Sequence, residues 1–322
     1  MTIIYLGSLF EEHDTGAGHP ESARRIEKVN KDLLSTVAPA IKSDGGFGDI
    51  TVGSITPAER TVIEKVHQSG QVDKVMNITA SGGGFIDGDT VLSSDSYHIA
   101  AAAVGVCIDA VDQIVDQNHH NALCLIRPPG HHATADTSMG FCLFNNIAIA
   151  AEYALKNKQL GRVLIIDWDV HHGNGTQDIF YGKEDVFYFS THRYPFYPGS
   201  GHESETGTGA GLGKTLNIPM AADISRSDFL DQFQLGLDQA FVKCKPDLVM
   251  ISAGFDAHYL DPVGSLGLET EDFGLMTEMV IDRARQYCAG RILSVLEGGY
   301  HPGALYQSIA LHLQKLSVYK PS

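Results

Sequence analysis

Residues 163–175 read VLIIDWDVHHGNG, an apolar run followed directly by acids, histidines and a glycine-rich turn. The first four residues are β-branched or leucine, which is typical of a strand buried on both faces of a parallel sheet. Strand side chains alternate between the two faces, so Asp167, Asp169 and His171 are predicted to point to one side. Open α/β sheets bind ligands at the carboxyl ends of their strands. We therefore expect a functional site where this strand ends.

Similar apolar runs recur along the chain and alternate with longer segments of helical spacing. The predicted strands are residues 3–6, 123–126, 163–166, 186–189, 248–251 and 292–296. The predicted helices are residues 99–115, 147–155, 229–241, 273–287 and 305–316, and Thr270 is expected to cap the fourth of them. This alternation predicts an α/β fold: a single domain over residues 1–322, with a mostly parallel central β-sheet flanked by helices.

Composition limits the classes of partner. The 322 residues include 23 basic and 39 acidic side chains, a formal charge of −16, which argues against nucleic acid because phosphate backbones require basic surfaces. No uninterrupted apolar run reaches the ~18 residues that span a bilayer, so we expect no membrane partner. The apolar N-terminal stretch lacks the basic residues that precede a signal sequence, which predicts a cytoplasmic protein. The five cysteines form no Cys-x-x-Cys pair and are expected to be buried thiols.

A metal site is predicted at two of the strand ends. Two neighbouring carboxylates, Asp167 and Asp169, would repel each other without a cation. The strand at residues 248–251 is followed closely by Asp256, which would complete an Asp–His–Asp set with Asp169 and His171. Three protein ligands with one open position are the catalytic arrangement of zinc.

Two further strand ends carry candidates for acid–base chemistry. A rigid Arg-Pro-Pro-Gly turn at residues 127–130 presents His131 and His132, and histidine is the side chain whose pKa suits a base near neutrality. The Glu-Gly-Gly-Tyr sequence at residues 297–300 ends in Tyr300, whose hydroxyl is suited to donate to a developing oxyanion. Together the four strand ends fit metal-assisted amide hydrolysis. No Gly-x-Ser-x-Gly sequence supports a serine nucleophile instead.

The chain resembles the zinc-dependent histone deacetylase family, which includes acetylpolyamine amidohydrolases, and its class II-like and bacterial members in particular. The segments that carry the resemblance are residues 19–21, 127–133, 140–146, 167–177, 252–258 and 296–300, in the family's order. The resemblance implies the arginase–deacetylase fold. It also implies removal of acetyl or other short acyl groups from lysine side chains of a peptide or protein substrate, by water activated at a catalytic Zn²⁺.

The resemblance further implies roles for individual residues. Zinc is expected on Asp169, His171 and Asp256. The catalytic groups are expected to be His132 as general base, His131 as its companion oriented by Asp167, and Tyr300 as oxyanion donor, with Asn174 behind His132. The acyl-lysine tunnel is expected to involve Gly140, Phe141, Tyr197 and Gly299, with Val263 at its rim.

Structural K⁺ is implied as well. The first potassium is expected near the zinc strand, and a second farther away through main-chain carbonyls. The expected residues are Asp167, Asp169, His171, Ser190 and Thr191 for the first ion, and Phe180, Lys183 and Val186 for the second.

Three different functions are also compatible with parts of this pattern. An acetylpolyamine amidohydrolase would act on the same amide, but Val263 stands where polyamine-selective relatives tend to have an acid, which favours acyl-lysine. An arginase-like ureohydrolase would need more Asp and His ligands, for two manganese ions. A non-catalytic acyl-group binder would not need the complete set of catalytic groups found in this sequence.

Overall fold

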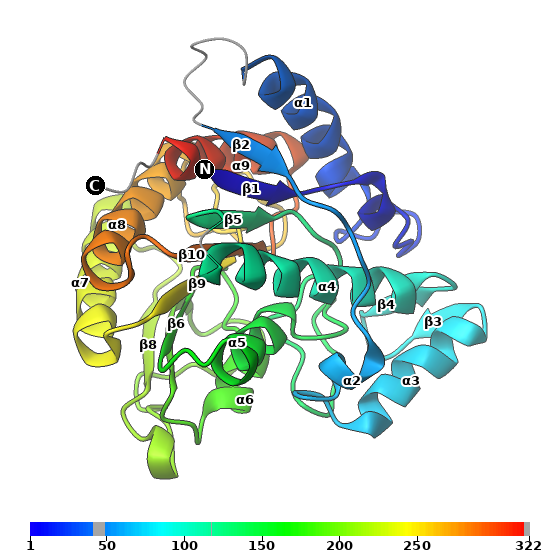
Figure 1. Ribbon diagram of the computed structural model, residues 1–322, viewed down its shortest axis with the longest axis horizontal. Helices are drawn as coiled ribbons and strands as arrows, with labels where there is room; N and C mark the ends of the chain where they lie inside the picture. Colours follow the sequence, from blue (N-terminus) through cyan, green and yellow to red (C-terminus); the bar gives the residue numbers. More distant parts are fainter. Residues whose placement is uncertain (41–48, 117, 319–322) are drawn as a thin grey trace.

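A sheet of eight parallel strands forms the centre of the computed structural model, which describes residues 1–40, 49–116 and 118–318 (Figure 1). The strands are ordered β2-β1-β5-β10-β9-β6-β7-β8, and every neighbouring pair is parallel. Their bounds are β1 Thr2–Tyr5, β2 Ile50–Val52, β5 Asn121–Cys124, β6 Val163–Asp167, β7 Val186–Arg193, β8 Thr215–Met220, β9 Leu248–Ala253 and β10 Ile292–Leu296. The predicted parallel α/β architecture is confirmed.

Helices cover both faces of this sheet. On one face lie α4 (Ser96–Val115) and α5 (Asn146–Asn157). The other face is covered by α7 (Arg226–Cys244), α8 (Thr270–Cys288) and α9 (Pro302–Ser317), with α1 (Arg24–Ala40) against α9. The shorter elements are η1 Ser8–Glu11, α2 Arg60–Ile63, α3 Ser69–Ala80, β3 Gly83–Phe85, β4 Val91–Ser93, α6 Asn174–Phe180 and η2 Gly209–Gly211. The antiparallel pair β3–β4 lies apart from the main sheet.

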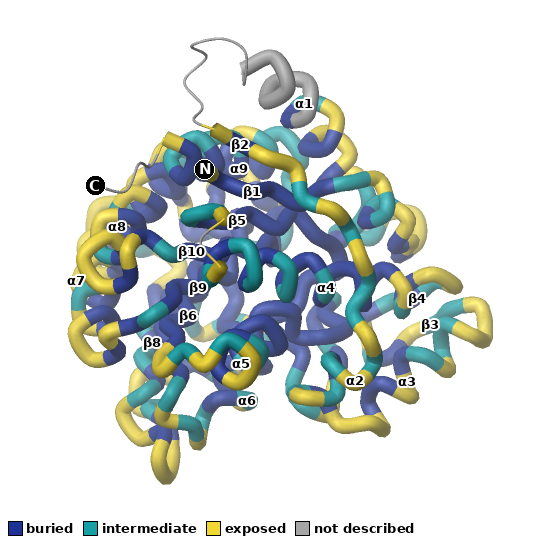
Figure 2. The backbone as a smooth tube through the Cα atoms, viewed as in Figure 1, coloured by how far each residue is buried: buried dark blue, intermediate teal, exposed yellow. Residues whose placement is uncertain are grey.

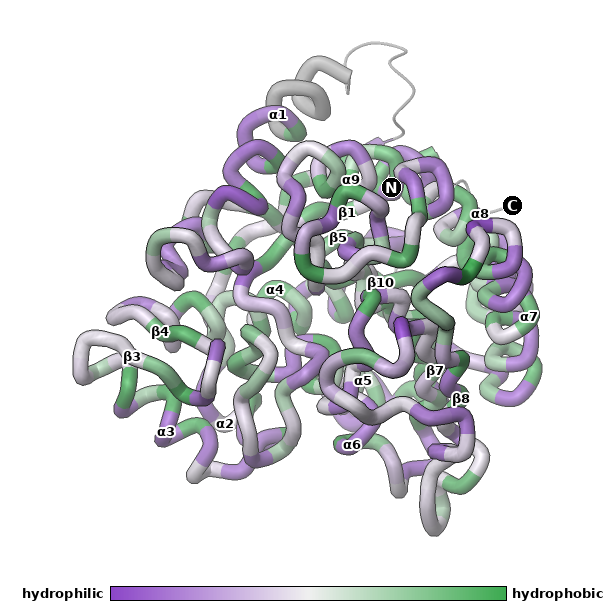
Figure 3. The backbone as a smooth tube through the Cα atoms, turned by 180° about the vertical axis from the view of Figure 1, so that it is seen from behind, coloured by the Kyte–Doolittle hydropathy of each residue, from purple (hydrophilic) through white to green (hydrophobic). Residues whose placement is uncertain are grey.

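The strands and the inner helix faces form the core (Figure 2). Strands β6 and β9 are buried at every position, as their continuous apolar sequences predict. The outer helices α7 and α8 mix hydrophobic and hydrophilic residues along their length, as amphipathic helices do (Figure 3). All five cysteines are free and buried, as expected.

All six predicted strands and all five predicted helices are present, but several elements were missed. The edge strand β8 contains Pro219, and its three buried residues include the polar Thr215 and Asn217, so it lacks the continuous apolar run of a central strand. Edge strand β2 has three residues, of which two are exposed. The predicted cap of α8 is also wrong: Thr270 is the first helical residue. Glu269 is the cap, in a reciprocal capping box with Asp272.

Helix α4 is long and apolar enough to cross a membrane, judged by length and composition alone. No uninterrupted apolar run of that length occurs in it, so the sequence pattern predicts no membrane span there. In the fold α4 packs on the sheet beside α5, and 61% of its apolar window is buried inside the protein. Its apolar composition is that of a core helix.

The strand order brings the predicted functional segments together. Strands β5, β10, β9 and β6 are adjacent and parallel, so their carboxyl ends meet at one edge of the sheet. His131 and His132 follow β5, Tyr300 follows β10, and Asp256 follows β9. Asp169 and His171 follow β6. Segments more than a hundred residues apart in the sequence therefore share one site.

A buried ionic cluster supports this edge from the side of η1 and α1. The Glu21 carboxylate accepts hydrogen bonds from Arg127 Nε at 2.6 Å and Nη2 at 2.8 Å, and from Arg25 Nη1 at 2.8 Å. Burial alone would raise the pKa of Glu21, but the two guanidinium groups hold it well below its usual range. Arg127 also donates to the carbonyls of Phe10 and His13, which ties the N-terminal segment to the end of β5.

We predict that Glu21→Gln lowers the free energy of unfolding by about 3–5 kcal/mol, measured by urea denaturation, because two buried guanidinium groups lose their counter-charge. The matched control is Glu278→Gln. Glu278 pairs with Lys315 Nζ at 2.6 Å on the surface between α8 and α9, and its loss is expected to cost less than about 1 kcal/mol. Equal, small losses in the two variants would contradict the structural role of Glu21.

Candidate active site

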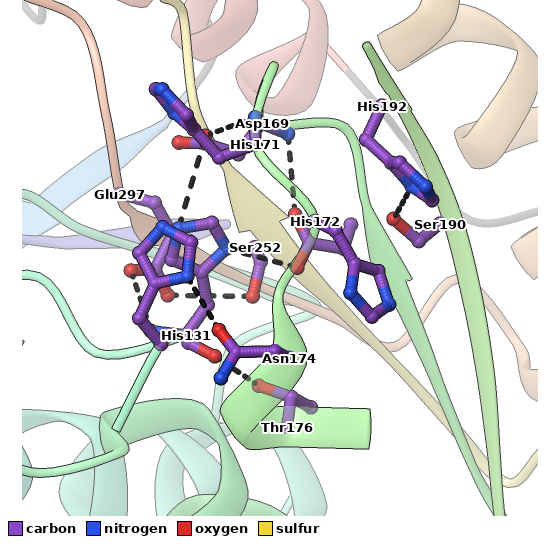
Figure 4. A network of polar contacts seen from close by, with 12 residues as sticks. His131, Asp169, His171, His172, Asn174, Thr176, Ser190, His192, Ser252 and Glu297 are labelled. Atoms are coloured by element: carbon purple, nitrogen blue, oxygen red, sulfur yellow. Dashed lines mark hydrogen bonds and ion pairs between the residues drawn. The ribbon is translucent and has the colours of Figure 1, made fainter. Parts of the chain in front are cut away.

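Three potential metal ligands meet where β6 and β9 end. Donor atoms of Asp169, His171 and Asp256 all lie within 4.8 Å of one another. His171 Nδ1 is 3.1 Å from Asp169 Oδ1 (Figure 4). It is also 3.1 Å from Asp256 Oδ2, and all three side chains are buried. The structure thus brings together the three residues that were predicted from the sequence as zinc ligands.

The backbone fixes the two carboxylates of this group. Gly298 N–H donates to Asp169 Oδ2 at 2.7 Å, and Val170 N–H donates to Asp256 Oδ1 at 2.8 Å. A Cβ atom on Gly254 would lie 2.1 Å from Asp169 Oδ2, and one on Gly298 would lie 2.3 Å from Asp256 Oδ2. Both positions therefore require glycine, because the carboxylates pack directly against the main chain.

The electrostatics of the group are those of a cation site. Burial and the charge of Asp169 raise the pKa of Asp256 to about 7. Burial would lower the pKa of His171, but hydrogen bonds to the two carboxylates raise it to about 10. Protonated His171 thus supplies the positive charge between Asp169 and Asp256 that a metal cation would otherwise supply. Two carboxylate oxygens and one imidazole nitrogen are donors that zinc accepts, so the residues present fit a Zn²⁺ ion with an open coordination position.

His131 is held as a cation beside this group. Its Nδ1 lies 3.1 Å from Asp167 Oδ2, which also accepts a hydrogen bond from the Tyr188 hydroxyl at 3.0 Å. Burial would lower the pKa of His131, but the charges of Asp169 and Asp167 raise it to about 10. His131 therefore donates to Asp167 and remains protonated at neutral pH.

His132 lies in the opposite electrostatic situation. Its Nδ1 is 2.8 Å from the side-chain amide oxygen Oδ1 of Asn174, and its ring centroid is 4.0 Å from that of His131. Burial and then the positive charges of His131 and His171 hold the pKa of His132 well below its usual range. The neutral ring donates from Nδ1 to Asn174, which leaves the Nε2 lone pair available as a base.

A pocket of about 250 Å³ opens above these residues. It is lined by Asp89, His132, Gly140, Phe141, His171, Phe196, Tyr197, Val263 and Tyr300. Gly140 has φ 56°, and a Cβ there would lie 2.5 Å from His132 Cδ2, so this wall must be glycine. Four of the five residues expected around the tunnel therefore line this pocket.

Gly299 is the exception and corrects one expectation. A Cβ on Gly299 would point at Leu305 Cδ1, 2.7 Å away, and at Phe255 in the core. The glycine therefore makes room for core side chains rather than for a substrate. Two lining residues were not predicted: Phe196, whose ring stacks on His171 with centroids 5.1 Å apart, and Asp89. Neither residue lies in the segments that carried the resemblance.

The residues expected to bind potassium lie in two places. Asp167 pairs with Ser190 across β6 and β7, and Thr191 is buried with no hydrogen-bond partner for its hydroxyl among the described residues. Phe180, Lys183 and Val186 surround the connection from α6 to β7, where the Lys183 N–H donates to the Phe180 carbonyl at 3.0 Å. Potassium binding at either place stays a prediction.

Glu297 is a further buried group that sequence reasoning did not single out. Its Oε2 accepts hydrogen bonds from the N–H groups of Gly130 at 2.7 Å and His131 at 3.1 Å, and Ser252 donates to its Oε1 (Figure 4). Burial raises the pKa of Glu297 to about 7, against the opposing charge of His131. Its backbone partners are far away in the sequence, so no local pattern could have found this contact.

Comparison with known proteins identifies similar chains over nearly the whole length. A sequence model described as "Histone deacetylase domain" matches residues 19–316. A probable deacetylase of Archaeoglobus fulgidus is 34% identical over 302 residues, which cover 93% of this chain and 81% of the relative. The histone deacetylase-like amidohydrolase of Pseudomonas aeruginosa is 35% identical over 285 residues, covering 88% and 73%. The crystal structure of the HDA15 HD domain matches with TM-score 0.88 and 33% identity, covering 100% of this chain and 90% of that one.

We predict that zinc binding to the metal-free protein releases protons. At pH 7 His171, with a pKa of about 10, is protonated, and Asp256, whose pKa is raised to about 7, retains part of its proton. Because both must lose their protons to bind metal, we expect between about one and two protons per zinc. The number of protons released per zinc falls towards one as the pH rises above 7, because Asp256 has then already lost its proton. Calorimetric titration in buffers of different ionisation enthalpy measures this number.

The matched control is His202→Asn, an exposed histidine outside the group, which is expected to leave zinc affinity and proton release unchanged. Asp256→Asn is expected to weaken zinc binding. Proton uptake, or zinc binding that is insensitive to Asp256→Asn, would contradict the assignment.

Proposed function

This chain belongs to the histone deacetylase family and is a deacetylase or amidohydrolase of that family, and we propose that it removes acetyl or other short acyl groups from lysine side chains of peptides or proteins with a zinc ion. The observation that carries the proposal is the pocket itself. His171 of the metal group, His132 and Tyr300 all line it. A residue of the metal group, a histidine held neutral and a tyrosine thus line one cavity.

Each side chain has a distinct task in amide hydrolysis. Zinc, when bound, supplies a Lewis acid that polarises the carbonyl and acidifies water. Neutral His132 accepts the proton of the attacking water and returns it to the leaving amine. His131 stays protonated and keeps positive charge beside the His132 ring, whose centroid lies 4.0 Å away. Burial holds the pKa of Tyr300 well above its usual value, so its hydroxyl remains protonated and donates to the carbonyl oxygen.

The pocket walls support a lysine-type substrate. Phe141, Phe196 and Tyr197 form an apolar, aromatic lining that suits an aliphatic stem, and Val263 continues this lining at the rim. Asp89 lines the same pocket and is the observation that favours the second candidate, an acetylated polyamine with a cationic end. Because Asp89 would also attract the basic residues of a protein segment, the apolar rim at Val263 decides our preference for acyl-lysine.

An arginase-like ureohydrolase and a non-catalytic acyl-group binder have less support. Within the described parts of the chain, a single group of His, Cys, Asp and Glu side chains has metal-site spacing, and it has three members. An arginase-like enzyme with two manganese ions would need more ligands. A non-catalytic binder would have no use for the neutral His132 and the protonated Tyr300 at one cavity.

We predict that the protein releases acetate from an acetyl-lysine peptide, that chelation abolishes this activity and that zinc restores it. Tyr300→Phe removes the donor to the oxyanion and is expected to lower kcat about 10²–10³-fold. His132→Ala removes the base and is expected to lower kcat about 10²–10⁴-fold. Neither change removes a ligand, so zinc content, measured by elemental analysis, is expected to stay the same.

Tyr259→Phe is the matched control, because Tyr259 is a 55%-exposed tyrosine outside the pocket. Its kcat is expected to equal that of the unmodified enzyme. Full activity in metal-free protein would overturn the zinc mechanism, and an unchanged kcat in Tyr300→Phe would overturn the role of that hydroxyl.

We also predict a higher kcat/KM for an acetyl-lysine peptide than for acetylputrescine or acetylspermidine. Val263→Glu places a carboxylate at the rim and is expected to shift the ratio of the two kcat/KM values towards polyamine about two- to fivefold, the range of an exposed ion pair. Val263→Gln has the same size without the charge and is expected to produce no such shift. A preference of the unmodified enzyme for the polyamine would reverse our choice of substrate.

A further inference from the structure

The peptide group between Gly299 and Tyr300 is held at both of its polar ends by side chains of opposite charge. The carbonyl of Gly299 accepts a hydrogen bond from Arg25 Nε at 2.6 Å. The N–H of Tyr300, which points away from that carbonyl at the opposite edge of the same peptide group, donates to Asp261 Oδ2 at 2.7 Å. Both side chains are buried, and Arg25 also lies over the Tyr300 ring, 4.9 Å from its centroid. The orientation of this peptide plane is therefore fixed by two distant segments.

The backbone at Gly298 and Gly299 is intrinsically free to adopt several conformations, so its orientation depends on these two side chains. Gly299 has φ 123°, a conformation open to glycine but rarely to other residues, and Gly298 precedes it. Two consecutive glycines give the chain many alternative paths between β10 and α9. The peptide plane determines the direction in which the Tyr300 side chain leaves the backbone. A change of this direction moves the hydroxyl away from the pocket.

The other oxygen of Asp261 holds the backbone at another residue that lines the pocket, Val263. Asp261 Oδ1 accepts hydrogen bonds from the N–H groups of Val263 at 2.9 Å and Gly264 at 3.1 Å. Val263 and Tyr300 both line the pocket; in the proposed function Val263 forms the rim and Tyr300 is the oxyanion donor. One carboxylate of the loop after β9 thus connects the rim to the segment after β10.

We infer that Asp261 is a positioning residue that aims the Tyr300 hydroxyl at the reacting carbonyl and links it to the rim at Val263. The inference rests on the proposed function, because it assigns Asp261 an effect that passes through Tyr300. Asp261 does not line the pocket and is not one of the three metal-site residues, so it acts on the reaction by way of Tyr300. Arg25 holds the other end of the same peptide group.

A double-mutant cycle tests this inference, because residues that act through one another show non-additive effects. Asp261→Ala is expected to lower kcat about 10- to 100-fold, as misplacement of a catalytic group does. In the Tyr300→Phe background, where no hydroxyl remains to be aimed, the same change is expected to alter kcat less than about twofold. Asp261→Asn keeps one acceptor oxygen and nearly the same volume, and an intermediate kcat is expected.

The matched control is Asp247→Asn. Asp247 also accepts two backbone N–H groups, those of Gly161 and Arg162, both at 2.9 Å, but it lies at the opposite end of β9 from the site. Its kcat is expected to be unchanged. Zinc content and thermal unfolding of each variant identify any loss of folded protein, and Asp261→Asn replaces Asp261→Ala in the cycle if the alanine variant is unfolded.

The same cycle can be measured by binding, without turnover. The probe is a trifluoromethyl ketone analogue of acetyl-lysine, whose hydrated carbonyl presents an oxygen to Tyr300. We expect Asp261→Ala and Tyr300→Phe to weaken its binding non-additively. Equal losses in both backgrounds, or no loss in Asp261→Ala, would overturn the inference. Absence of deacetylase activity in the unmodified enzyme would instead overturn the proposed function, while the binding cycle still decides the role of Asp261.

Discussion

Two buried carboxylates, those of Asp169 and Asp256, face each other at the carboxyl edge of the sheet, and the rest of the site depends on how their repulsion is relieved. Backbone N–H groups of Val170 and Gly298 satisfy the outer oxygens, and His171 lies between the inner ones. These contacts leave net negative charge in a buried place, which a divalent cation neutralises best. The glycines at positions 254 and 298 follow from the same requirement, since only a bare backbone reaches the carboxylates.

The charges around the site give the two adjacent histidines, His131 and His132, different protonation states. His131 contacts Asp167 and is held as a cation, whereas His132 contacts the neutral amide of Asn174 and is held neutral. The cation on His131 itself lowers the pKa of His132, so the two states support each other. One charged and one neutral histidine are thus obtained from two identical side chains, because their partners come from the end of β6 and the start of α6.

Catalytic groups on flexible segments need support from outside the sheet. The Glu21–Arg127–Arg25 cluster joins the N-terminal segment to the ends of β5 and β10. Arg25 and Asp261 form hydrogen bonds with the two ends of the peptide group between Gly299 and Tyr300. The local sequence around Tyr300 contains two glycines and no sign of these partners. For that reason sequence reasoning singled out Tyr300 but neither of the side chains that hold its backbone, and it placed Gly299 at the substrate instead of against Leu305.

The sequence by itself determined the six central strands, the five helices of long amphipathic or apolar pattern, and the chemistry at four strand ends, because these depend on local periodicity and residue type. Residues 163–175 already contained Asp169 and His171, although β6 ends at Asp167 and both residues lie beyond the strand. Only the tertiary structure decided the adjacency of β5, β10, β9 and β6, which brings Asp256 to Asp169 and Asn174 to His132. It also decided the edge strand β8, the wall residue Phe196 and the buried Glu297. These features depend on contacts between segments far apart in the chain, and such contacts leave no periodic pattern in the sequence.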